Sequence, residues 1–279
     1  MKADIRLIAL DMDGTLLDDD HATIPPRNTA ALRAAAAQGV KIAIASGRCW
    51  ALIRETAAQL DTVHYGITSN GAFTWDAAAR KAIRKFPMDQ QQCLHIIDVL
   101  NKWNVVYELY VDGENYVESA QLDGVELHFH DILTPEFFEV YLRNTTLVPD
   151  MRAFIATCQP EKFDIFYIPP EHRAEILADL HRTGELSYAG ALGVNLEMTA
   201  PNVHKGRALA ALAAELGLTS DQVMAFGDAD NDLEMLEWAG WSFAMENATD
   251  QAKAAAKFVT GLNREGGVGM AVEKFCLLP

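Results

Sequence analysis

The chain has 279 residues, half of them hydrophobic, and its 39 acidic and 23 basic side chains give a formal net charge of −16 at pH 7. This length is enough for one large domain or two ordinary domains with hydrophobic cores. Because such an acidic surface repels nucleic acids and anionic membranes, we expect neither as a partner. An anionic substrate would need a local patch of positive charge that includes a metal ion.

The cysteine pattern and the absence of long apolar runs indicate a cellular compartment. Four scattered cysteines, none in a C-x-x-C pair, are Cys49, Cys93, Cys158 and Cys276. They predict neither a zinc site nor a disulfide framework and are typical of a reducing environment. The N-terminal apolar run is too short for a signal peptide, and no run reaches the roughly 18 apolar residues of a membrane span. We therefore expect a cytoplasmic protein, whose oligomeric state the sequence leaves open.

The first third of the chain alternates between predicted strands and helices. Short apolar runs predict strands at 5–10, 40–46 and 65–72. Helical patterns lie between them at 27–38 and 48–60. This order predicts a parallel sheet with crossover helices.

The pattern changes after residue 86 and returns near residue 200. A predicted helix at 87–103 precedes a predicted hairpin at 105–119. A strand, a helix and a strand follow at 160–168, 169–183 and 195–199, and residues 119–150 fit no clear pattern. The α/β alternation then resumes with a helix at 206–216, a strand at 222–226 and a helix at 232–239. We predict a discontinuous α/β core, 1–86 and 200–279, with an inserted α+β domain at 87–199.

Two aspartates follow the first predicted strand. A strand that ends at Asp11 and Asp13 places both carboxylates at the edge of the sheet where open α/β sheets bind their ligands. Gly14 then lets the backbone turn sharply away. The same residues are equally consistent with an ordinary polar turn, so the other strand ends have to decide. The acids that follow, Asp18 to Asp20, are expected to form a solvated loop.

Polar groups also follow two later strands and begin one helix. Ser46 and Gly47 place a hydroxyl and a backbone N–H where they can cradle an anion, although Ser-Gly is also a common turn. Acids at 228, 230 and 232 repel one another unless a cation such as Mg²⁺ relieves them, or they cap the next helix. Lys205 lies in the first turn of a predicted helix, where the helix dipole disfavours a positive charge. A phosphate bound between Lys205 and the acids would explain this position; the alternative is an ordinary surface lysine.

In their order and spacing, "DMDGTLLD", "IAIASGR", Lys205 and "GDADNDLEML" resemble the four motifs of the haloacid dehalogenase superfamily. The chain is similar to its Cof-type sugar-phosphate phosphatases, which carry a large α+β cap between the second and third motifs. The resemblance covers about 1–86 and 200–279 and implies a Rossmann-like parallel sheet with helices on both faces plus the inserted cap. Ser46 stands where many members have Thr, which keeps the hydroxyl.

The resemblance implies a Mg²⁺-dependent phosphomonoester hydrolase for small phosphorylated metabolites. Asp11 would attack phosphorus to form an aspartyl phosphate, and Asp13 would first protonate the leaving oxygen and then activate water. The implied metal ligands are Asp11, Asp13 through its backbone carbonyl, and Asp228, with Asp232 supporting them. The groups implied to hold the phosphoryl oxygens are Ser46, Gly47, Lys205 and Asn231.

Three other functions compete with hydrolysis. A phosphotransferase or phosphomutase of the same superfamily would use the same acids, although an acid at Asp13 favours transfer to water. A non-catalytic protein that binds a phosphorylated ligand would be expected to have lost one of the key residues. A dehalogenase needs no Mg²⁺ and would leave the second acid cluster unexplained. The substrate itself stays open, because aromatic residues such as Tyr107 and Tyr110 fit either a sugar-stacking site or the core of the insertion.

Overall fold

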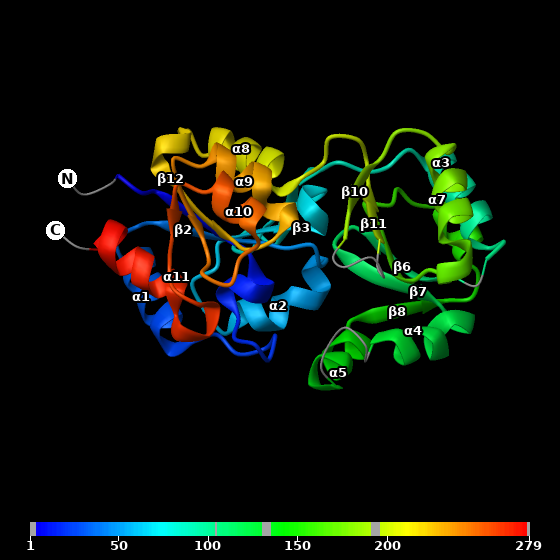
Figure 1. The fold of residues 1–279 in the computed structure, drawn as a ribbon, viewed down its shortest axis with the longest axis horizontal. Helices are drawn as coiled ribbons and strands as arrows, with labels where there is room; N and C mark the ends of the chain where they lie inside the picture. Colours follow the sequence, from blue (N-terminus) through cyan, green and yellow to red (C-terminus); the bar gives the residue numbers. More distant parts are fainter. Residues whose placement is uncertain (1–3, 104, 130–134, 191–195, 278–279) are drawn as a thin grey trace. The chain divides into compact units, whose positions relative to one another are not determined.

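The computed structural model describes residues 4–103, 105–129, 135–190 and 196–277. These residues form two compact units (Figure 1). The first unit comprises Met1–Arg48, Ile53–Arg84 and His204–Pro279. The second comprises Cys49–Leu52 and Lys85–Val203. The short segment at Cys49–Leu52 therefore belongs with residues that the sequence analysis assigned to the insertion.

The first unit is built on an eight-stranded sheet in the order β14-β13-β12-β1-β2-β3-β4-β5. Adjacent strands from β14 to β3 are parallel, and β4 is antiparallel to β3. The strands are β1 (Leu7–Leu10), β2 (Lys41–Ala45), β3 (Tyr65–Thr68), β4 (Phe73–Asp76), β5 (Lys81–Lys85), β12 (Val223–Gly227), β13 (Trp241–Ala244) and β14 (Phe258–Val259).

Helices cover both faces of this sheet (Figure 1). They are α1 (Pro26–Ala37), α2 (Trp50–Ala58), α8 (Lys205–Glu215), α9 (Leu233–Trp238), α10 (Asp250–Ala255) and α11 (Gly267–Val272). On one face, Leu209 and Leu212 of α8 and Met235 of α9 pack on the buried side chains of the central strands. Helices α1 and α11 pack on each other at the opposite face. The predicted parallel α/β sheet is confirmed, whereas strands β4 and β5 were not predicted.

The second unit is an α+β module around a six-stranded sheet in the order β10-β11-β9-β6-β7-β8. Its strands are β6 (Val106–Val111), β7 (Glu114–Glu118), β8 (Thr145–Val148), β9 (Lys162–Tyr167), β10 (Ser187–Ala189) and β11 (Leu196–Thr199). Its helices are α3 (Gln90–Leu100), α4 (Leu122–Phe129), α5 (Pro135–Arg143), α6 (Met151–Ile155) and α7 (Arg173–His181). Residues 119–150, which fitted no pattern in the sequence, contain α4, α5 and β8.

The β6–β7 hairpin forms where the sequence predicted it. Its turn residues, Asp112 and Gly113, both have positive φ, at 55° and 77°, as the tight hairpin turns preferred by Asp-Gly require. Tyr107 and Tyr110 are almost fully buried in the hydrophobic clusters on the two faces of the sheet. Of the two interpretations of these tyrosines, the structure supports the core of the module. Among the described residues, no helix is long and apolar enough to cross a membrane.

Candidate active site

The topology of the first sheet brings three strand ends together. Strand β1 lies between β2 and β12, with Leu10 in register with Ile44 and Phe226. The N–H of Asp11 continues this register by donating to the carbonyl of Phe226 at 3.1 Å. The side chains that follow β1, β2 and β12 therefore share one edge of the sheet, the edge at which open α/β sheets bind ligands.

The turn after Asp11 requires glycine at position 14. Gly14 has a φ of 75°, and a Cβ atom there would overlap the carboxylate of Asp228. The next residue, Thr15, donates its hydroxyl to Oδ1 of Asp228 at 2.7 Å. The turn thus packs tightly against the acid cluster after β12.

Lys205, at the first position of α8, is fully buried and bridges two carboxylates. Its Nζ donates to Oδ1 of Asp11 at 2.6 Å and to Oδ1 of Asp232 at 2.8 Å. Burial by itself would lower the pKa of Lys205, but the two carboxylates outweigh burial and raise it. Sequence reasoning expected a phosphate between this lysine and the acids; in the structure the ammonium contacts Asp11 and Asp232 directly.

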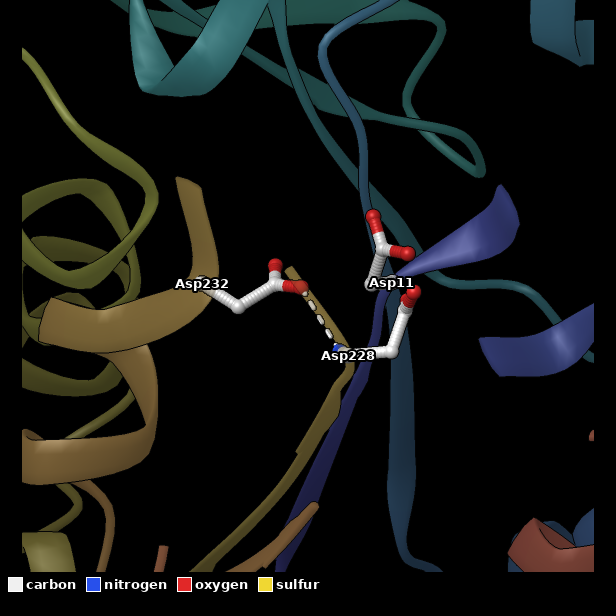
Figure 2. Close-up of side chains that lie close together, drawn as sticks. All are labelled: Asp11, Asp228 and Asp232. Carbon is white, nitrogen blue, oxygen red and sulfur yellow. Dashed lines mark hydrogen bonds between the residues drawn. The ribbon is translucent and has the colours of Figure 1, made fainter. Parts of the chain in front are cut away.

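A third carboxylate, that of Asp228, lies beside the two that Lys205 bridges. Oxygens of Asp11, Asp228 and Asp232 all lie within 4.8 Å of one another (Figure 2). Burial, reinforced by the charge of Asp232, raises the pKa of Asp11 well above its ordinary value. The same two causes raise the pKa of Asp228 to about 6. Three carboxyl groups therefore lie together beside one described ammonium, and the all-oxygen donor set suits a hard divalent cation such as Mg²⁺.

Asp232 is occupied by partners within the protein. Its Oδ1 accepts from Lys205, and its Oδ2 accepts from the backbone N–H groups of Asp228 at 3.0 Å and Ala229 at 3.2 Å. Asp232 thus orients both the lysine and the loop that carries Asp228. These contacts leave the carboxylates of Asp11 and Asp228 as the other members of the cluster.

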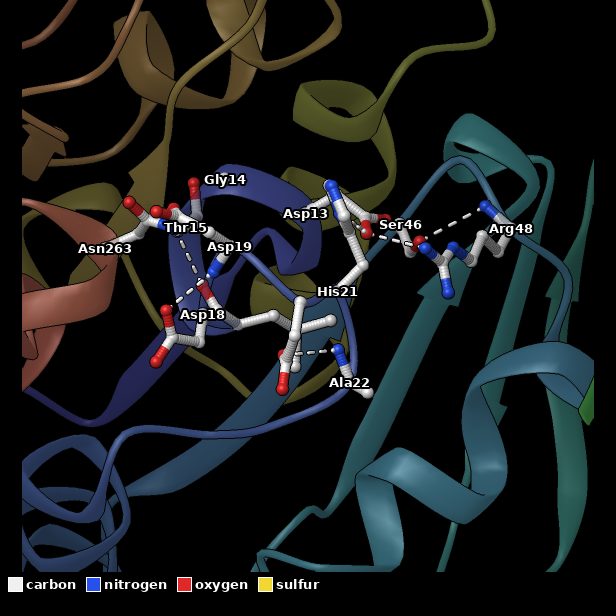
Figure 3. Close-up of polar contacts among 12 residues, drawn as sticks. Asp13, Gly14, Thr15, Asp18, Asp19, His21, Ala22, Ser46, Arg48 and Asn263 are labelled. Carbon is white, nitrogen blue, oxygen red and sulfur yellow. Dashed lines mark hydrogen bonds and ion pairs between the residues drawn. The ribbon is translucent and has the colours of Figure 1, made fainter. Parts of the chain in front are cut away.

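The side chain of Asp13 lies outside this carboxylate cluster and belongs to a different network (Figure 3). Its Oδ1 accepts from Nη2 of Arg48 at 2.5 Å and from Nδ1 of His21 at 2.9 Å. Burial would raise the pKa of Asp13, but the charge of Arg48 and the bond to His21 outweigh it and lower the pKa. The same bond raises the pKa of His21.

The predicted phosphate cradle lies at the end of β2. Ser46 is buried, and its Oγ accepts from the backbone N–H of Arg48 at 3.1 Å. Gly47 stands between these two residues in the chain. Asn70 links the cradle to the acid loop, because its N–H donates to the carbonyl of Ser46 at 3.1 Å and its Oδ1 accepts from Nδ2 of Asn231 at 3.3 Å.

The family model of the haloacid dehalogenase-like hydrolases matches residues 8–272, which is nearly the whole chain. The chain belongs to this family. The predicted resemblance is therefore confirmed, and the buried acids described above lie in a hydrolase of this class.

Curated relatives of this haloacid dehalogenase-like hydrolase are phosphatases. A 5-amino-6-(5-phospho-D-ribitylamino)uracil phosphatase of Bacillus subtilis is 31% identical over 274 residues, which are 98% of this chain and 97% of that protein. A phosphatase of the same name from Escherichia coli is 27% identical over a region that covers 97% of this chain and 96% of that protein. The chain is thus a phosphatase of the family.

Solved structures show the same fold. A haloacid dehalogenase-like hydrolase from B. subtilis superposes with a TM-score of 0.84 at 24% identity, and the superposition covers 98% of this chain and 100% of that chain. A HAD subclass IIB sugar phosphatase superposes with a TM-score of 0.80 at 24% identity, with the same coverage. At this identity the likeness is one of fold, and it agrees with the predicted architecture.

Sequence reasoning did not assign three residues that this hydrolase places at the site. Thr15 and Asn70 stand beside recognised motifs, and the Asn-Gly at the end of β3 was a visible turn signal for Asn70. His21 has no sequence signal, because it follows three acids that were expected to form a solvated loop.

Proposed function

We propose that the chain is a Mg²⁺-dependent hydrolase of small phosphomonoesters that works through an aspartyl phosphate on Asp11. The observation that carries this proposal is the contact of Asp11 with Lys205 at 2.6 Å inside a cluster of three carboxyl groups that lie beside one described ammonium. A carboxylate nucleophile, a fixed ammonium and a cation-binding acid cluster are the groups that transfer of a phosphoryl dianion requires.

The first step would be attack by a carboxylate oxygen of Asp11 on phosphorus. The new P–O bond forms as the ester P–O bond breaks, and the leaving oxygen takes a proton from Asp13. Asp13 has a lowered pKa in the structure, and a phosphate dianion beside it would raise that pKa. The substrate itself would thus favour the protonated form of Asp13 that the first step needs.

The second step would be hydrolysis of the aspartyl phosphate. Asp13, now ionised, takes a proton from a water molecule as that water attacks phosphorus. The bond between phosphorus and the oxygen of Asp11 breaks, which releases inorganic phosphate and restores the carboxylate. The hydrogen bonds from Arg48 and His21 stabilise the ionised form of Asp13 that acts as this base.

The residues present fit a Mg²⁺ site. We assign the carboxylates of Asp11 and Asp228 as ligands, together with the backbone carbonyl of Asp13, while Asp232 orients Lys205 and the loop of Asp228. Bound Mg²⁺ supplies positive charge between the phosphate dianion and the nucleophile. The groups we assign to the phosphoryl oxygens are Ser46, Gly47, Lys205 and Asn231.

We further propose that the first unit performs the chemistry and that the second unit is the cap that selects the substrate. All of the residues assigned above belong to the first unit. Relatives from B. subtilis and E. coli are named for a phosphorylated ribitylaminouracil, which makes phosphorylated polyols and sugars the first substrates to test. Phosphoryl transfer to an acceptor other than water is the alternative outcome.

The test is phosphate release from a panel of sugar, polyol and aryl phosphates, measured for the wild type, for Asp11→Asn and for a matched control, Asp250→Asn. Asp250 is an exposed acid in the first turn of α10. We expect Asp250→Asn to be active and Asp11→Asn to lose at least about 4 kcal/mol of transition-state stabilisation, roughly a thousandfold in kcat. EDTA should abolish wild-type activity, and Mg²⁺ should restore it better than Ca²⁺ does, because Ca²⁺ takes more ligands at longer distances. Full turnover in EDTA, or by Asp11→Asn, would contradict the mechanism.

A further inference from the structure

The three acids after Leu17 build a folded loop rather than a merely solvated one. The N–H of Asp18 donates to the carbonyl of Thr23 at 2.8 Å, and the N–H of His21 donates to the carbonyl of Asp18 at 3.0 Å. Oδ1 of Asp20 accepts from the backbone N–H groups of Ala22 at 2.9 Å and Thr23 at 2.8 Å. The loop is thus closed by its own polar groups.

A second set of contacts anchors this loop from outside. Oδ1 of Asp19 accepts from Nδ2 of Asn263 at 3.1 Å, and Oδ2 of Asp19 forms an ion pair with Arg264 at 3.3 Å. Nδ2 of Asn263 also donates to the carbonyl of Leu17 at 3.0 Å. Asn263 thus bonds both to Leu17, where the loop begins, and to Asp19 within the loop (Figure 3). These bonds fix the position of residue 21 relative to the rest of the first unit.

His21 adopts a backbone conformation that few residues with a side chain adopt. Its φ is 56°, in the left-handed region, which glycine adopts most readily and which asparagine, aspartate and histidine tolerate better than other residues with a Cβ atom. The imidazole is 36% exposed, and His21 is not among the residues of the described hydrophobic clusters. Its described bond to a side chain is the one from Nδ1 to Oδ1 of Asp13, at 2.9 Å. The closed and anchored loop thus holds this uncommon backbone conformation at the point where the imidazole meets Asp13, which indicates a role in the site.

Both donors of Asp13 fall on the same oxygen. Arg48, from the loop after β2, and His21, from the loop after β1, donate to Oδ1 at 2.5 and 2.9 Å. No described group donates to Oδ2. Two donors on one oxygen fix the rotation of the carboxyl group about its Cβ–Cγ bond, which leaves Oδ2 to exchange the proton with substrate and water.

We propose that His21 is a positioning residue, which together with Arg48 clamps Oδ1 of Asp13 so that Oδ2 points to the reacting atoms. This role rests on the acid and base functions proposed for Asp13. A misdirected carboxyl group would slow both proton transfers while substrate binding stayed the same, because none of the contacts described for His21 is with Ser46 or Gly47 of the predicted phosphate cradle. The signature is therefore a loss of kcat with KM unchanged.

The test exploits the unusual backbone of residue 21. His21→Gly removes the imidazole and also relieves the left-handed conformation, so it should leave the melting temperature unchanged or raised. His21→Asn keeps an N–H donor on Cγ, where the histidine has Nδ1, and asparagine tolerates this conformation. The matched control is Arg80→Gly, because Arg80 has a φ of 52° and lies exposed in the turn between β4 and β5.

Steady-state kinetics with an alkyl phosphate should separate these variants. We expect kcat of His21→Gly to fall about tenfold or more while its KM stays within about twofold of the wild type. In His21→Asn, about half or more of this loss in log kcat should be recovered. Arg80→Gly should have the kcat of the wild type. With an aryl phosphate, whose leaving group needs no acid, His21→Gly should show a pre-steady-state burst of phenol, since only the hydrolysis of the phosphoenzyme is slowed.

A His21→Gly variant with kcat within about twofold of the wild type would overturn the proposal, as would a loss of kcat that follows a loss of folded protein. Equal kinetics of His21→Gly and His21→Asn would also contradict it. These outcomes are distinct from failure of the proposed function, which would appear as turnover by Asp11→Asn.

Discussion

Replacing Lys205 by methionine tests the central electrostatic feature of the site. Methionine matches the length of the apolar stem and removes only the charge and the donors. The change leaves Asp11 and Asp232, whose Oδ1 atoms lie 2.6 and 2.8 Å from the ammonium, as buried carboxylates with no cation. Removal of one partner of a buried ion pair costs about 3–5 kcal/mol of folding free energy. Since Lys205 bridges two carboxylates, we expect a loss near about 5 kcal/mol in the absence of divalent metal.

The assay is urea unfolding in EDTA, followed by circular dichroism, for Lys205→Met, Asp232→Asn and the double variant. The double variant removes one of the two stranded carboxylates, so its loss should be smaller than the sum of the single losses by at least about 1 kcal/mol. The matched control is Lys81→Met, because Lys81 is exposed on β5, and it should change stability by less than about 0.5 kcal/mol. Excess Mg²⁺ should reduce the loss in Lys205→Met, because the metal supplies the missing charge.

Two results would refute this reasoning. The first is a loss below about 1 kcal/mol for Lys205→Met in EDTA, which would mean that the lysine does not compensate the acids. The second is strict additivity in the double variant. In the same variant, kcat/KM should fall for all substrates alike, since Lys205 is assigned to the phosphoryl group that they share.

Two further predictions concern a buried carboxyl group and a glycine. Burial, followed by the charge of Asp112, raises the pKa of Glu161 to about 7. The folded protein therefore holds this proton more tightly than the unfolded chain does. As the pH rises from 4.5 to above 7, the free energy of unfolding of the wild type should fall by about 3 kcal/mol relative to that of Glu161→Gln. Parallel urea midpoints of the two proteins across that range would contradict the assignment. Gly14→Ala should cost more stability than Gly39→Ala, because both positions have positive φ but only at position 14 does a Cβ atom meet a neighbour, the Asp228 carboxylate. Activity should fall in Gly14→Ala alone, and equal effects of the two substitutions on melting temperature and kcat would show that the contact with Asp228 is unimportant.

Much of the first unit was predictable because its patterns are local. Apolar runs of strand length alternate with helical stretches, and parallel strands bring their carboxyl ends to one edge of the sheet. That rule alone predicts that Asp11, Ser46 and Asp228 lie close together at this edge. The chemical roles of these residues stay predictions, but their shared location follows from the topology.

Other elements escaped prediction because their local signals are weak. Strand β5, with the sequence Lys-Ala-Ile-Arg-Lys, is an edge strand with mostly charged residues, so it shows no apolar run. Strand β10 has only three residues, Ser187–Ala189, and is defined by its pairing with β11. The segment at Cys49–Leu52 belongs to the second unit through contacts such as the bond from the N–H of Ala51 to the carbonyl of Gly113, at 2.8 Å.

By itself, the sequence determined the class of the fold, the family and the strand ends that carry the acids, because each of these depends on residues near one another in the chain. Only the tertiary structure decided which polar groups meet. Lys205 lies 194 residues from Asp11, and Arg48 lies 35 residues from Asp13. Nothing local distinguishes a surface lysine from one buried between two carboxylates, nor an unbonded loop histidine from one bonded to the carboxylate of Asp13. Those differences arise when packing removes the groups from water, since a buried charge is stable only beside a partner.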